Sequence, residues 1–185
     1  MTNASAHPET VPAKGKQEYS ASFPPVVGET PRVLILGTLP GQESLRQQQY
    51  YAHPRNAFWK ILFQIFKKEF TTDYAKRLIF LMENKIALWD ICRLGTRKGS
   101  LDSAIKHEIP NEIPLLIKNH PSIKNVFFNG KKAEQLFGKY FEREARFTYT
   151  TLLSTSPANA RYHYAQKLKN WRQIKQTKNE SSGEI

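Results

Sequence analysis

The sequence predicts an α/β fold in which a parallel sheet is covered on both faces. Four short runs are almost continuously apolar, as strands buried on both sides are. These runs are Arg32–Gly37, Ile86–Asp90, Ile123–Phe128 and Phe147–Leu153. Segments with helical spacing of apolar residues separate them, and that alternation is typical of a parallel sheet flanked by helices.

The helix predicted most clearly begins at Phe58. Apolar residues recur from there to Phe66 at three- and four-residue spacing, while lysines lie off the stripe. Further helices are expected over Tyr74–Asn84, Glu112–Asn119, Glu134–Phe141 and Tyr164–Gln176. We therefore expect one domain over residues 29–177. Residues 1–28, rich in Ala, Ser, Thr, Pro and Glu, are expected to form a disordered arm, and residues 178–185 a frayed tail.

The charge of the chain indicates a polyanionic partner. Lys and Arg number 28 against 16 Asp and Glu, which gives a formal charge of +12. Residues 1–28 are neutral, because Lys14 and Lys16 balance Glu9 and Glu18. The excess charge therefore belongs to the folded part. In a domain of this size it favours nucleic acid as partner, with a solvated basic surface as the alternative.

Several classes of protein are excluded or left unsupported. Cys92 is the single cysteine, so an intrachain disulfide and a four-cysteine iron–sulfur site are impossible, and a reducing cytoplasm is expected. No apolar run approaches the roughly 20 residues that span a membrane, and no signal pattern opens the chain. His53 lacks a His or Cys partner at ligand spacing, so no metal site is predicted. The P-loop ending and the Gly-x-Ser-x-Gly elbow are absent. The separation of Glu43 and Asp90 cannot be read, so a two-carboxylate glycosidase arrangement is unsupported.

Small and polar residues follow each predicted strand. The clusters are Gly37-Thr38-Leu39-Pro40-Gly41, Trp89-Asp90, Asn129-Gly130 and Ser154-Thr155-Ser156-Pro157-Ala158-Asn159. The carboxyl ends of parallel strands meet at one edge of a sheet. Open α/β folds bind their ligands at that edge, so we expect the functional site there.

Residues 47–59, from Gln47 to Trp59, are dense in amides and aromatics and poor in carboxylates. That mixture suits a flat, neutral, hydrogen-bonding object such as a nucleobase. Two interpretations of Asn56 remain open, since its amide can cap the following helix or hold a water molecule. Phe58 can stack on a base or fill the core.

For each of the remaining clusters, a structural and a functional interpretation stay open. Asn129 ends a buried strand, where it could form a turn with Gly130 or bind a ligand edge that offers a donor and an acceptor. Residues 154–159 could cradle a phosphate or cap the last helix. From Arg161 to Lys178 the chain has six basic residues and no acid, which makes it the best candidate for a phosphate-facing surface; a solvated helix face is the alternative.

These motifs resemble the uracil-DNA glycosylase superfamily, and in particular its hypoxanthine (deoxyinosine) DNA glycosylase branch. The resemblance covers about residues 32–172 with the motifs in the right order. Residues 37–41 resemble the first motif of the superfamily, and His53-Pro54-Arg55-Asn56-Ala57-Phe58-Trp59 the segment that follows it in this branch. Phe128-Asn129-Gly130 resembles the strand-end asparagine, and residues 154–159 the second motif.

The resemblance implies a three-layer α/β/α sandwich around a four-stranded parallel sheet. It also implies a monofunctional DNA glycosylase of base excision repair that needs no cofactor. Such an enzyme flips a deaminated base out of the duplex and hydrolyses its N-glycosidic bond. Hypoxanthine is the expected base, with uracil and xanthine as further candidates, and the partner is DNA bound by a monomer.

The resemblance also implies roles for single residues. Leu39 stands where other branches carry an Asn or an acid, so Asn56 is the expected catalytic residue that positions water. Phe58 is expected to stack on the base, and Asn129 to read its edge. Ser154 replaces a His of the classical uracil enzymes. The other residues expected at the base are Gly37, Leu39, Tyr51 and His53. Those expected to hold DNA are Ser154, Ser156, Pro157, Ala158, Asn159 and Arg161, with Arg161 or a neighbour filling the gap in the duplex.

Leu39 also motivates an alternative, a non-catalytic protein that binds damaged DNA on the same fold. A third interpretation, a hydrolase of small nucleotides, fits the basic last helix less well, because so small a substrate does not need it.

Overall fold

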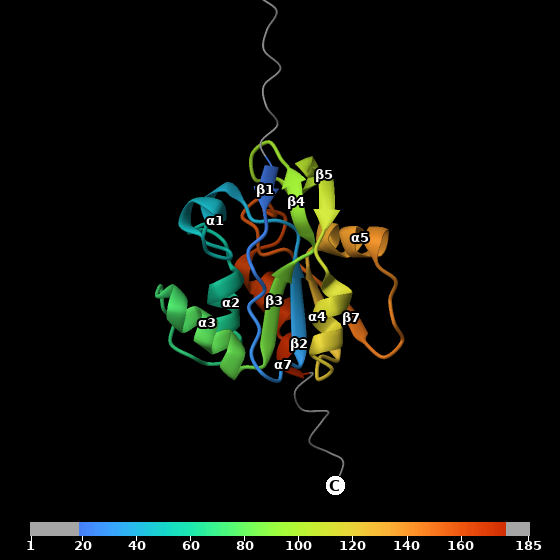
Figure 1. Cartoon of the computed structure of the whole chain (residues 1–185). Helices are drawn as coiled ribbons and strands as arrows, with labels where there is room; N and C mark the ends of the chain where they lie inside the picture. The colour runs from blue at the N-terminus through green and yellow to red at the C-terminus, as the bar shows by residue number, and fades with distance from the viewer. Residues whose placement is uncertain (1–18, 177–185) are drawn as a thin grey trace, which may run out of the picture.

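The computed structural model describes residues 19–176, and its centre is a four-stranded parallel sheet (Figure 1). The strands lie in the order β3-β2-β6-β7. They are β2 (Val33–Gly37), β3 (Ile86–Asp90), β6 (Asn125–Asn129) and β7 (Thr148–Leu152). Each neighbouring pair is parallel. All four predicted strands are thus present and pair as expected.

The apolar run of β2 reflects burial on both faces. Val33 and Ile35 pack into one core, while Leu34 and Leu36 pack into the other. Successive side chains of a strand point to opposite faces, so a central strand covered on both sides has no polar position.

Helices cover both faces of this sheet and complete the three layers. One layer contains α2 (Phe58–Ile65), α3 (Tyr74–Glu83), α6 (Tyr164–Trp171) and α7 (Gln173–Gln176). The other contains α4 (Ile113–Asn119) and α5 (Lys131–Tyr140). The α/β/α prediction is therefore confirmed. Among residues 19–176, no helix has the length and apolar character to cross a bilayer.

The helices differ from the predictions by more than one residue in the following respects. Helix α5 begins at Lys131, three residues before the expected start. The expected last helix divides into α6 and α7 at Arg172. A short helix, α1 (Gln42–Gln47), follows the turn after β2 and was not predicted.

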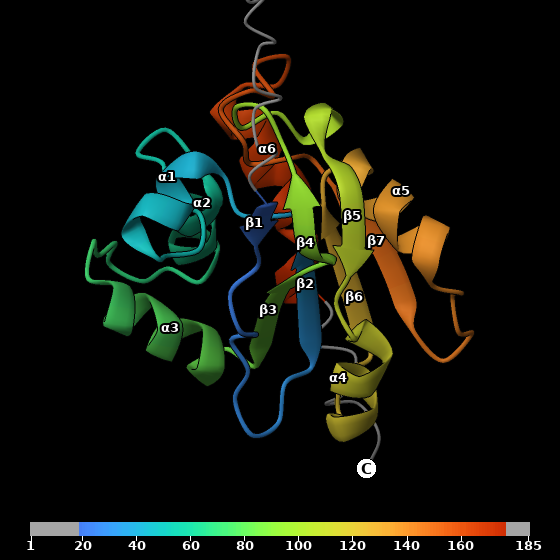
Figure 2. The ribbon, with the colours of Figure 1, turned by 45° about the horizontal axis from the view of Figure 1, so that its top comes forward.

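A second, antiparallel sheet in the order β1-β4-β5 was also not predicted (Figure 2). Its strands are β1 (Tyr19–Ala21), β4 (Cys92–Thr96) and β5 (Lys106–Pro110), with the 3-10 helix η1 (Asp102–Ala104) before β5. Strand β4 follows β3 after Ile91 alone, so this sheet lies beyond the carboxyl end of the main sheet (Figure 1).

The predicted disordered arm is wrong for residues 19–28. Strand β1 pairs with β4, and the backbone of Val26 exchanges hydrogen bonds with that of Leu88 at 2.9 Å in both directions. Phe23 and Val26 pack against one apolar core and Val27 against the other. The polar composition of the whole arm conceals these few apolar residues and their backbone pairing. Residues 1–18 and the tail 178–185 lie outside the described residues.

Candidate active site

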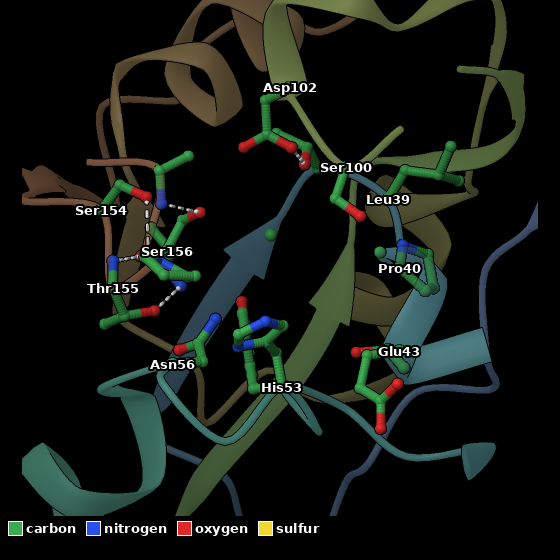
Figure 3. A pocket seen from close by; sticks show the side chains of 18 of the residues that line it. Leu39, Pro40, Glu43, His53, Asn56, Ser100, Asp102, Ser154, Thr155 and Ser156 are labelled. Carbon is green, nitrogen blue, oxygen red and sulfur yellow. Dashed lines mark hydrogen bonds between the residues drawn. The ribbon is translucent and has the colours of Figure 1, made fainter. Parts of the chain in front are cut away.

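A pocket of about 250 Å³ opens at the carboxyl ends of β2, β3 and β6 (Figure 3). Asp90 and Asn129 line it, together with four segments of the chain. These segments lie within residues 37–44, 50–56, 97–102 and 154–158. The polar clusters predicted to meet at one edge of the sheet therefore do meet, around a space suited to a small ligand.

Three neighbouring strand ends form the floor of the pocket, with Asp90 and Asn129 on either side of Gly37. A side chain at position 37 would collide with both walls. A Cβ atom there would lie 2.3 Å from Oδ1 of Asp90 and 2.8 Å from the hydroxyl oxygen of Tyr51. Glycine is needed here because any other residue would place its Cβ atom against these two oxygens.

Asp90 is a buried acid with an unsatisfied oxygen. Asp90 is 3% exposed. Neither its Oδ2 atom nor the Tyr51 hydroxyl has a hydrogen-bond partner within residues 19–176. Burial raises the pKa of Asp90 to about 7, because water no longer solvates the carboxylate. The negative charge of Asp102 raises this pKa further, and the positive charge of Arg97 opposes the rise.

Asn56 ends a tight turn at the pocket wall. Its backbone N–H donates to the carbonyl of His53 at 2.8 Å, with Pro54 at the turn position that its fixed φ favours. Its side-chain Oδ1 accepts the backbone N–H of Phe58 at 3.0 Å, near the start of α2. Asn56 thus satisfies the first N–H group of α2 from the position before the N-cap, Ala57, and this bond orients the side chain so that its NH₂ group remains free to bind a ligand or water.

His53 lies beside Asn56 in the pocket lining. Its ring Nδ1 accepts the backbone N–H of Arg55 at 3.1 Å. A neutral ring with Nδ1 as acceptor carries its proton on Nε2, so His53 offers the site a hydrogen-bond donor.

The structure does not place Phe58 at the pocket. Phe58 is 0% exposed, with edge contacts to Trp59 and Trp171. The Tyr51 ring stacks on it at a centroid distance of 4.0 Å, and Tyr51 lines the pocket. Stacking of Phe58 on a base needs a free ring face next to the ligand. Its core interpretation holds, and the aromatic residues that line the pocket are Tyr50 and Tyr51.

The side-chain amide of Asn129 makes two hydrogen bonds to the loop over residues 154–159. Its Oδ1 accepts the backbone N–H of Thr155, and its Nδ2 donates to the Thr155 hydroxyl, both at 2.9 Å. A carboxamide has two donors and two acceptor positions, so one donor and one acceptor position remain. Asn129 lines the pocket, and it can contact a base only with this remaining capacity.

The loop over residues 154–159 is held at several further points. The Ala57 N–H donates to the Thr155 carbonyl at 3.1 Å, and the Ser154 and Ser156 hydroxyls accept backbone N–H groups of the loop itself (Figure 3). Lys167 donates to the Ser156 carbonyl at 3.2 Å and is only 6% exposed. The prediction that Lys167 belongs to a phosphate-facing surface is therefore wrong, because its ammonium group supports the loop from inside.

The expected DNA-binding residues divide into two sets. Ser154, Ser156, Pro157 and Ala158 line the pocket, whereas Asn159 and Arg161 lie beyond its lining. Asn159 closes the loop through its Nδ2, which donates to the Ser154 carbonyl at 3.1 Å. Arg161 is exposed next to the loop and lies over the Tyr162 ring. Lys178 lies outside the described residues.

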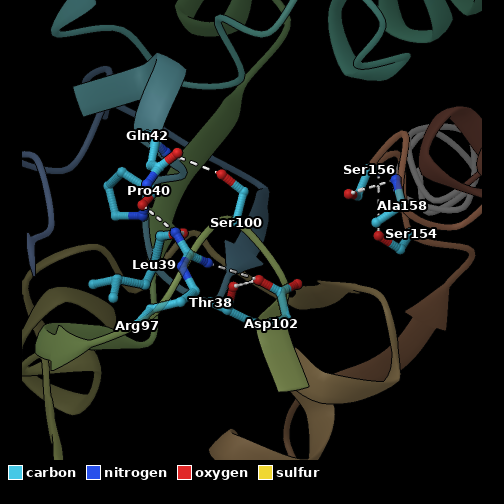
Figure 4. A network of polar contacts seen from close by, with 10 residues as sticks. All are labelled: Thr38, Leu39, Pro40, Gln42, Arg97, Ser100, Asp102, Ser154, Ser156 and Ala158. Atoms are coloured by element: carbon cyan, nitrogen blue, oxygen red, sulfur yellow. Dashed lines mark hydrogen bonds and ion pairs between the residues drawn. The ribbon is translucent and has the colours of Figure 1, made fainter. Parts of the chain in front are cut away.

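A polar network behind the first turn was missed by the sequence reasoning (Figure 4). The side chain of Arg97 is 3% exposed and pairs with Asp102 at 3.1 Å, and it donates to the carbonyls of Leu39 and Pro40. The Thr38 hydroxyl donates to Asp102 at 2.8 Å. The network fixes residues 38–40 and so the place of Leu39, which lines the pocket at 5% exposure. No local motif predicts it, because Arg97 and Asp102 contact residues 38–40, which lie more than 50 residues away in sequence.

No three His, Cys, Asp or Glu side chains within residues 19–176 gather as a metal site requires. The chemical groups at the pocket are instead an oriented amide, a histidine N–H, a buried carboxyl and a tyrosine ring. These groups can grip a planar base and assist hydrolysis.

Comparison with known proteins agrees with this geometry. The family model of the uracil DNA glycosylase superfamily matches residues 24–177. A protein of Methanosarcina barkeri named hypoxanthine DNA glycosylase is 44% identical over 142 residues, which are 75% of this chain and 87% of that protein. A protein of the same name from Methanosarcina acetivorans is 39% identical over 143 residues, 76% of this chain and 88% of its own length.

A solved structure shares the fold as well. It is a solution NMR structure from Methanosarcina acetivorans described as a candidate uracil DNA glycosylase. It has 33% sequence identity and a TM-score of 0.70, and the match covers 85% of this chain and 99% of that one. The chain therefore belongs to the uracil DNA glycosylase superfamily and is a DNA glycosylase, as its motifs indicated.

Proposed function

We propose that this enzyme releases hypoxanthine from DNA that contains deoxyinosine, leaving an abasic site for base excision repair. The observation that carries this proposal is the pocket at the sheet edge, whose floor is free of side chains at Gly37 and flanked by Asp90 and Asn129. The names of the two Methanosarcina relatives support the choice of base. Uracil and xanthine share an amide-like edge with hypoxanthine, and they are the further substrates to test.

We propose that Asn56 positions the attacking water. Its Oδ1 is bonded to the N–H of Phe58, so the direction of the amide is set before substrate binds. Leu39 at the first motif has no polar atom for this task, and it is buried against Gly95. An oriented donor lowers a barrier when it acts in the transition state, and loss of one such donor costs about 10²–10³ in rate.

The DNA strand is proposed to follow the loop over residues 154–159. The hydroxyls of Ser154 and Ser156 accept loop N–H groups and retain their own protons for phosphate oxygens. Arg161, exposed beside the loop, is proposed to enter the duplex or to hold its backbone. The surplus of positive charge makes binding strongly dependent on salt.

The test is a panel of oligonucleotides, single- and double-stranded, each with one deoxyinosine, deoxyuridine or deoxyxanthosine. Alkali-labile sites are scored under single-turnover conditions. The wild-type chain is expected to cut the deoxyinosine strand, and Asn56→Ala is expected to be about 100-fold slower while it still binds DNA. Full activity of Asn56→Ala would overturn the assignment of Asn56.

Two controls separate catalysis from folding. Asn56→Ala also removes the acceptor for the Phe58 N–H, which costs about 1 kcal/mol of stability. Asn56→Ser keeps a capping oxygen without the NH₂ group, and it is expected to be stable and slow. Asn119→Ala changes an exposed asparagine at the end of α4 and is expected to have wild-type rates.

A monomer that works in a reducing cytoplasm remains a prediction. Light scattering of the free protein and of its complex with DNA measures the first part, and fractionation of cells measures the second.

A further inference from the structure

Asp90 is a buried acid whose Oδ2 atom has no hydrogen-bond partner among residues 19–176. It stands at the end of β3, within the lining of the pocket, at 3% exposure. Its Oδ2 and the Tyr51 hydroxyl are the buried side-chain oxygens without a hydrogen-bond partner among residues 19–176. Buried polar atoms are almost always paired, so an unpaired pair of groups facing a pocket indicates that a ligand completes them.

The position of Asp90 fits contact with the bound base. Oδ1 of Asp90 and the Tyr51 hydroxyl converge on the space where a Cβ of residue 37 would lie. This space is the middle of the pocket floor, between the ends of β3 and β6. Asn129, on the other side of Gly37, already spends two of its four hydrogen-bonding positions on Thr155. Asp90 therefore has the greatest unused capacity at the floor.

The proposed substrate indicates what an unpaired carboxyl group could do at the pocket floor. A purine departs from its sugar with the electron pair of the glycosidic bond. The departure is easier when a ring nitrogen of the base takes up a proton, because the base then leaves without negative charge. A neutral carboxylic acid can supply that proton, whereas an amide such as Asn129 or Asn56 cannot.

We propose that Asp90 is a catalytic residue that donates its carboxyl proton to a ring nitrogen of the departing hypoxanthine. The assignment rests on the proposed release of hypoxanthine. The O–H bond of Asp90 breaks and an N–H bond forms on the base, while the C1′–N9 pair moves onto the base. The sugar becomes an oxocarbenium cation, and the new Asp90 carboxylate lies near it. Water then adds to C1′ and gives up a proton, which returns Asp90 to the acid form.

The surroundings of Asp90 keep the acid form available near neutral pH. Its pKa is raised to about 7, chiefly by burial. Two charged groups tune this value, because Asp102 raises the pKa and Arg97 lowers it. The other titratable groups that sense its charge are Tyr50, Tyr51, Tyr74 and Cys92, and burial raises the pKa of each. His53 and Glu43 also line the pocket, so variants rather than the wild-type profile must identify the group that titrates.

The test measures the single-turnover rate of hypoxanthine release from a deoxyinosine duplex between about pH 5 and pH 9. A required acid predicts a wild-type rate that falls about tenfold per pH unit above about pH 7. Asp90→Asn has nearly the same shape but no acidic proton. It is expected to be about 100-fold slower at low pH, to lose the alkaline fall, and to bind the duplex as before.

Asp102→Asn is the matched variant, since Asp102 is a second, partly buried acid in the same lining. Its neutralisation removes the charge that raises the Asp90 pKa and leaves Arg97 unopposed. The alkaline fall should persist with its midpoint at lower pH. An alkaline fall that persists in Asp90→Asn, or vanishes in Asp102→Asn, overturns the assignment of Asp90.

Different results would contradict the proposed release of hypoxanthine and the proposed role of Asp90. A wild-type chain that releases no hypoxanthine at any pH overturns the proposed function, and the role of Asp90 with it. A wild-type chain that is active, beside an Asp90→Asn variant of equal rate and equal pH profile, overturns the role of Asp90 alone. Circular dichroism checks that the variants are folded, and Asp90→Ser, which leaves more room, repeats the comparison if Asp90→Asn is not.

Discussion

At the scale of single residues, the floor of the pocket depends on one missing side chain. The two oxygens next to Gly37 would lie 2.3 and 2.8 Å from a Cβ, well inside van der Waals contact. Sequence reasoning placed Gly37 in the cluster after the first predicted strand and among the residues expected at the base. It did not identify the groups that occupy the space, because Tyr51 and Asp90 come from other segments of the chain.

The aromatic pair of Tyr51 and Phe58 shows a limit of what a sequence pattern can predict. Both rings belong to the 47–59 segment, and helical spacing correctly gives Phe58 an apolar role at the start of α2. Which of the two faces the ligand depends on the backbone between them. Tyr51 has a φ of 54°, a conformation that few aromatic residues adopt, and its ring covers Phe58.

The buried acid at position 90 has a consequence for stability. Its pKa is about 7 in the folded chain and about 4 in an unfolded chain, so between these values the folded state binds more protons. The free energy of unfolding therefore falls as pH rises from about 4 to about 7. Asp90→Asn removes this penalty and should stabilise the protein at pH 8 on the order of 4 kcal/mol, with little difference at about pH 4.

Thermal unfolding of both proteins at the two pH values measures this effect. An Asp90→Asn variant that is less stable than the wild type at pH 8 would show that the carboxylate makes a favourable contact in the folded chain. The claim that ionisation of Asp90 destabilises the folded chain would then be wrong.

At the scale of elements, the pocket depends on the joint between β6 and the loop after β7. Asn129 and Thr155 exchange two hydrogen bonds across 26 residues, and Thr155 is 0% exposed. The chain order predicted that both segments reach one edge. It could not predict that the amide of Asn129 binds the loop itself, because the partner of a strand-end amide is decided by tertiary packing.

Thr155→Val tests this joint. The change keeps the side-chain shape but leaves the Nδ2 of Asn129 without its acceptor, and a buried unpaired donor costs about 1–3 kcal/mol. Chemical denaturation should show this loss. Hypoxanthine release should also slow, because the loop is less firmly held. Thr148→Val, at an exposed position of β7, should change stability by no more than about 0.5 kcal/mol. Equal stability of the two variants would show that the hydrogen bonds between Asn129 and Thr155 do not stabilise the fold.

The main sheet could be predicted from the sequence, and the second sheet could not. Strands such as β2 are buried on both faces and so are continuously apolar. Strand β5, Lys-His-Glu-Ile-Pro, is mostly exposed and has no such pattern. Strand β1 is three residues long within a polar segment, and it forms only because β4 supplies an edge for pairing. Short exposed strands are set by their neighbours rather than by their own residues.

At the scale of the whole molecule, a pocket of about 250 Å³ occurs in a chain with a formal charge of +12. The parallel sheet delivers three strand ends to the pocket floor, while residues 50–56, the segment between β4 and β5, and residues 154–158 form its walls. The α/β/α architecture and the superfamily could be predicted, since both rest on long apolar runs and contiguous motifs. The Arg97–Asp102 network and the free carboxyl of Asp90 could not, because they arise from contacts between separate segments.

The most direct test of the central claim, that this pocket releases hypoxanthine, is the yield of free hypoxanthine by mass spectrometry from a duplex with one deoxyinosine. Gly37→Ala and Gly138→Ala make the same chemical change at two sites. Nothing lies within 4 Å of a Cβ at Gly138, whereas one at Gly37 fills the pocket floor. The wild-type chain and Gly138→Ala should release hypoxanthine at equal rates, and Gly37→Ala should release almost none. Equal release by all three proteins, or none by the wild type, would contradict the claim.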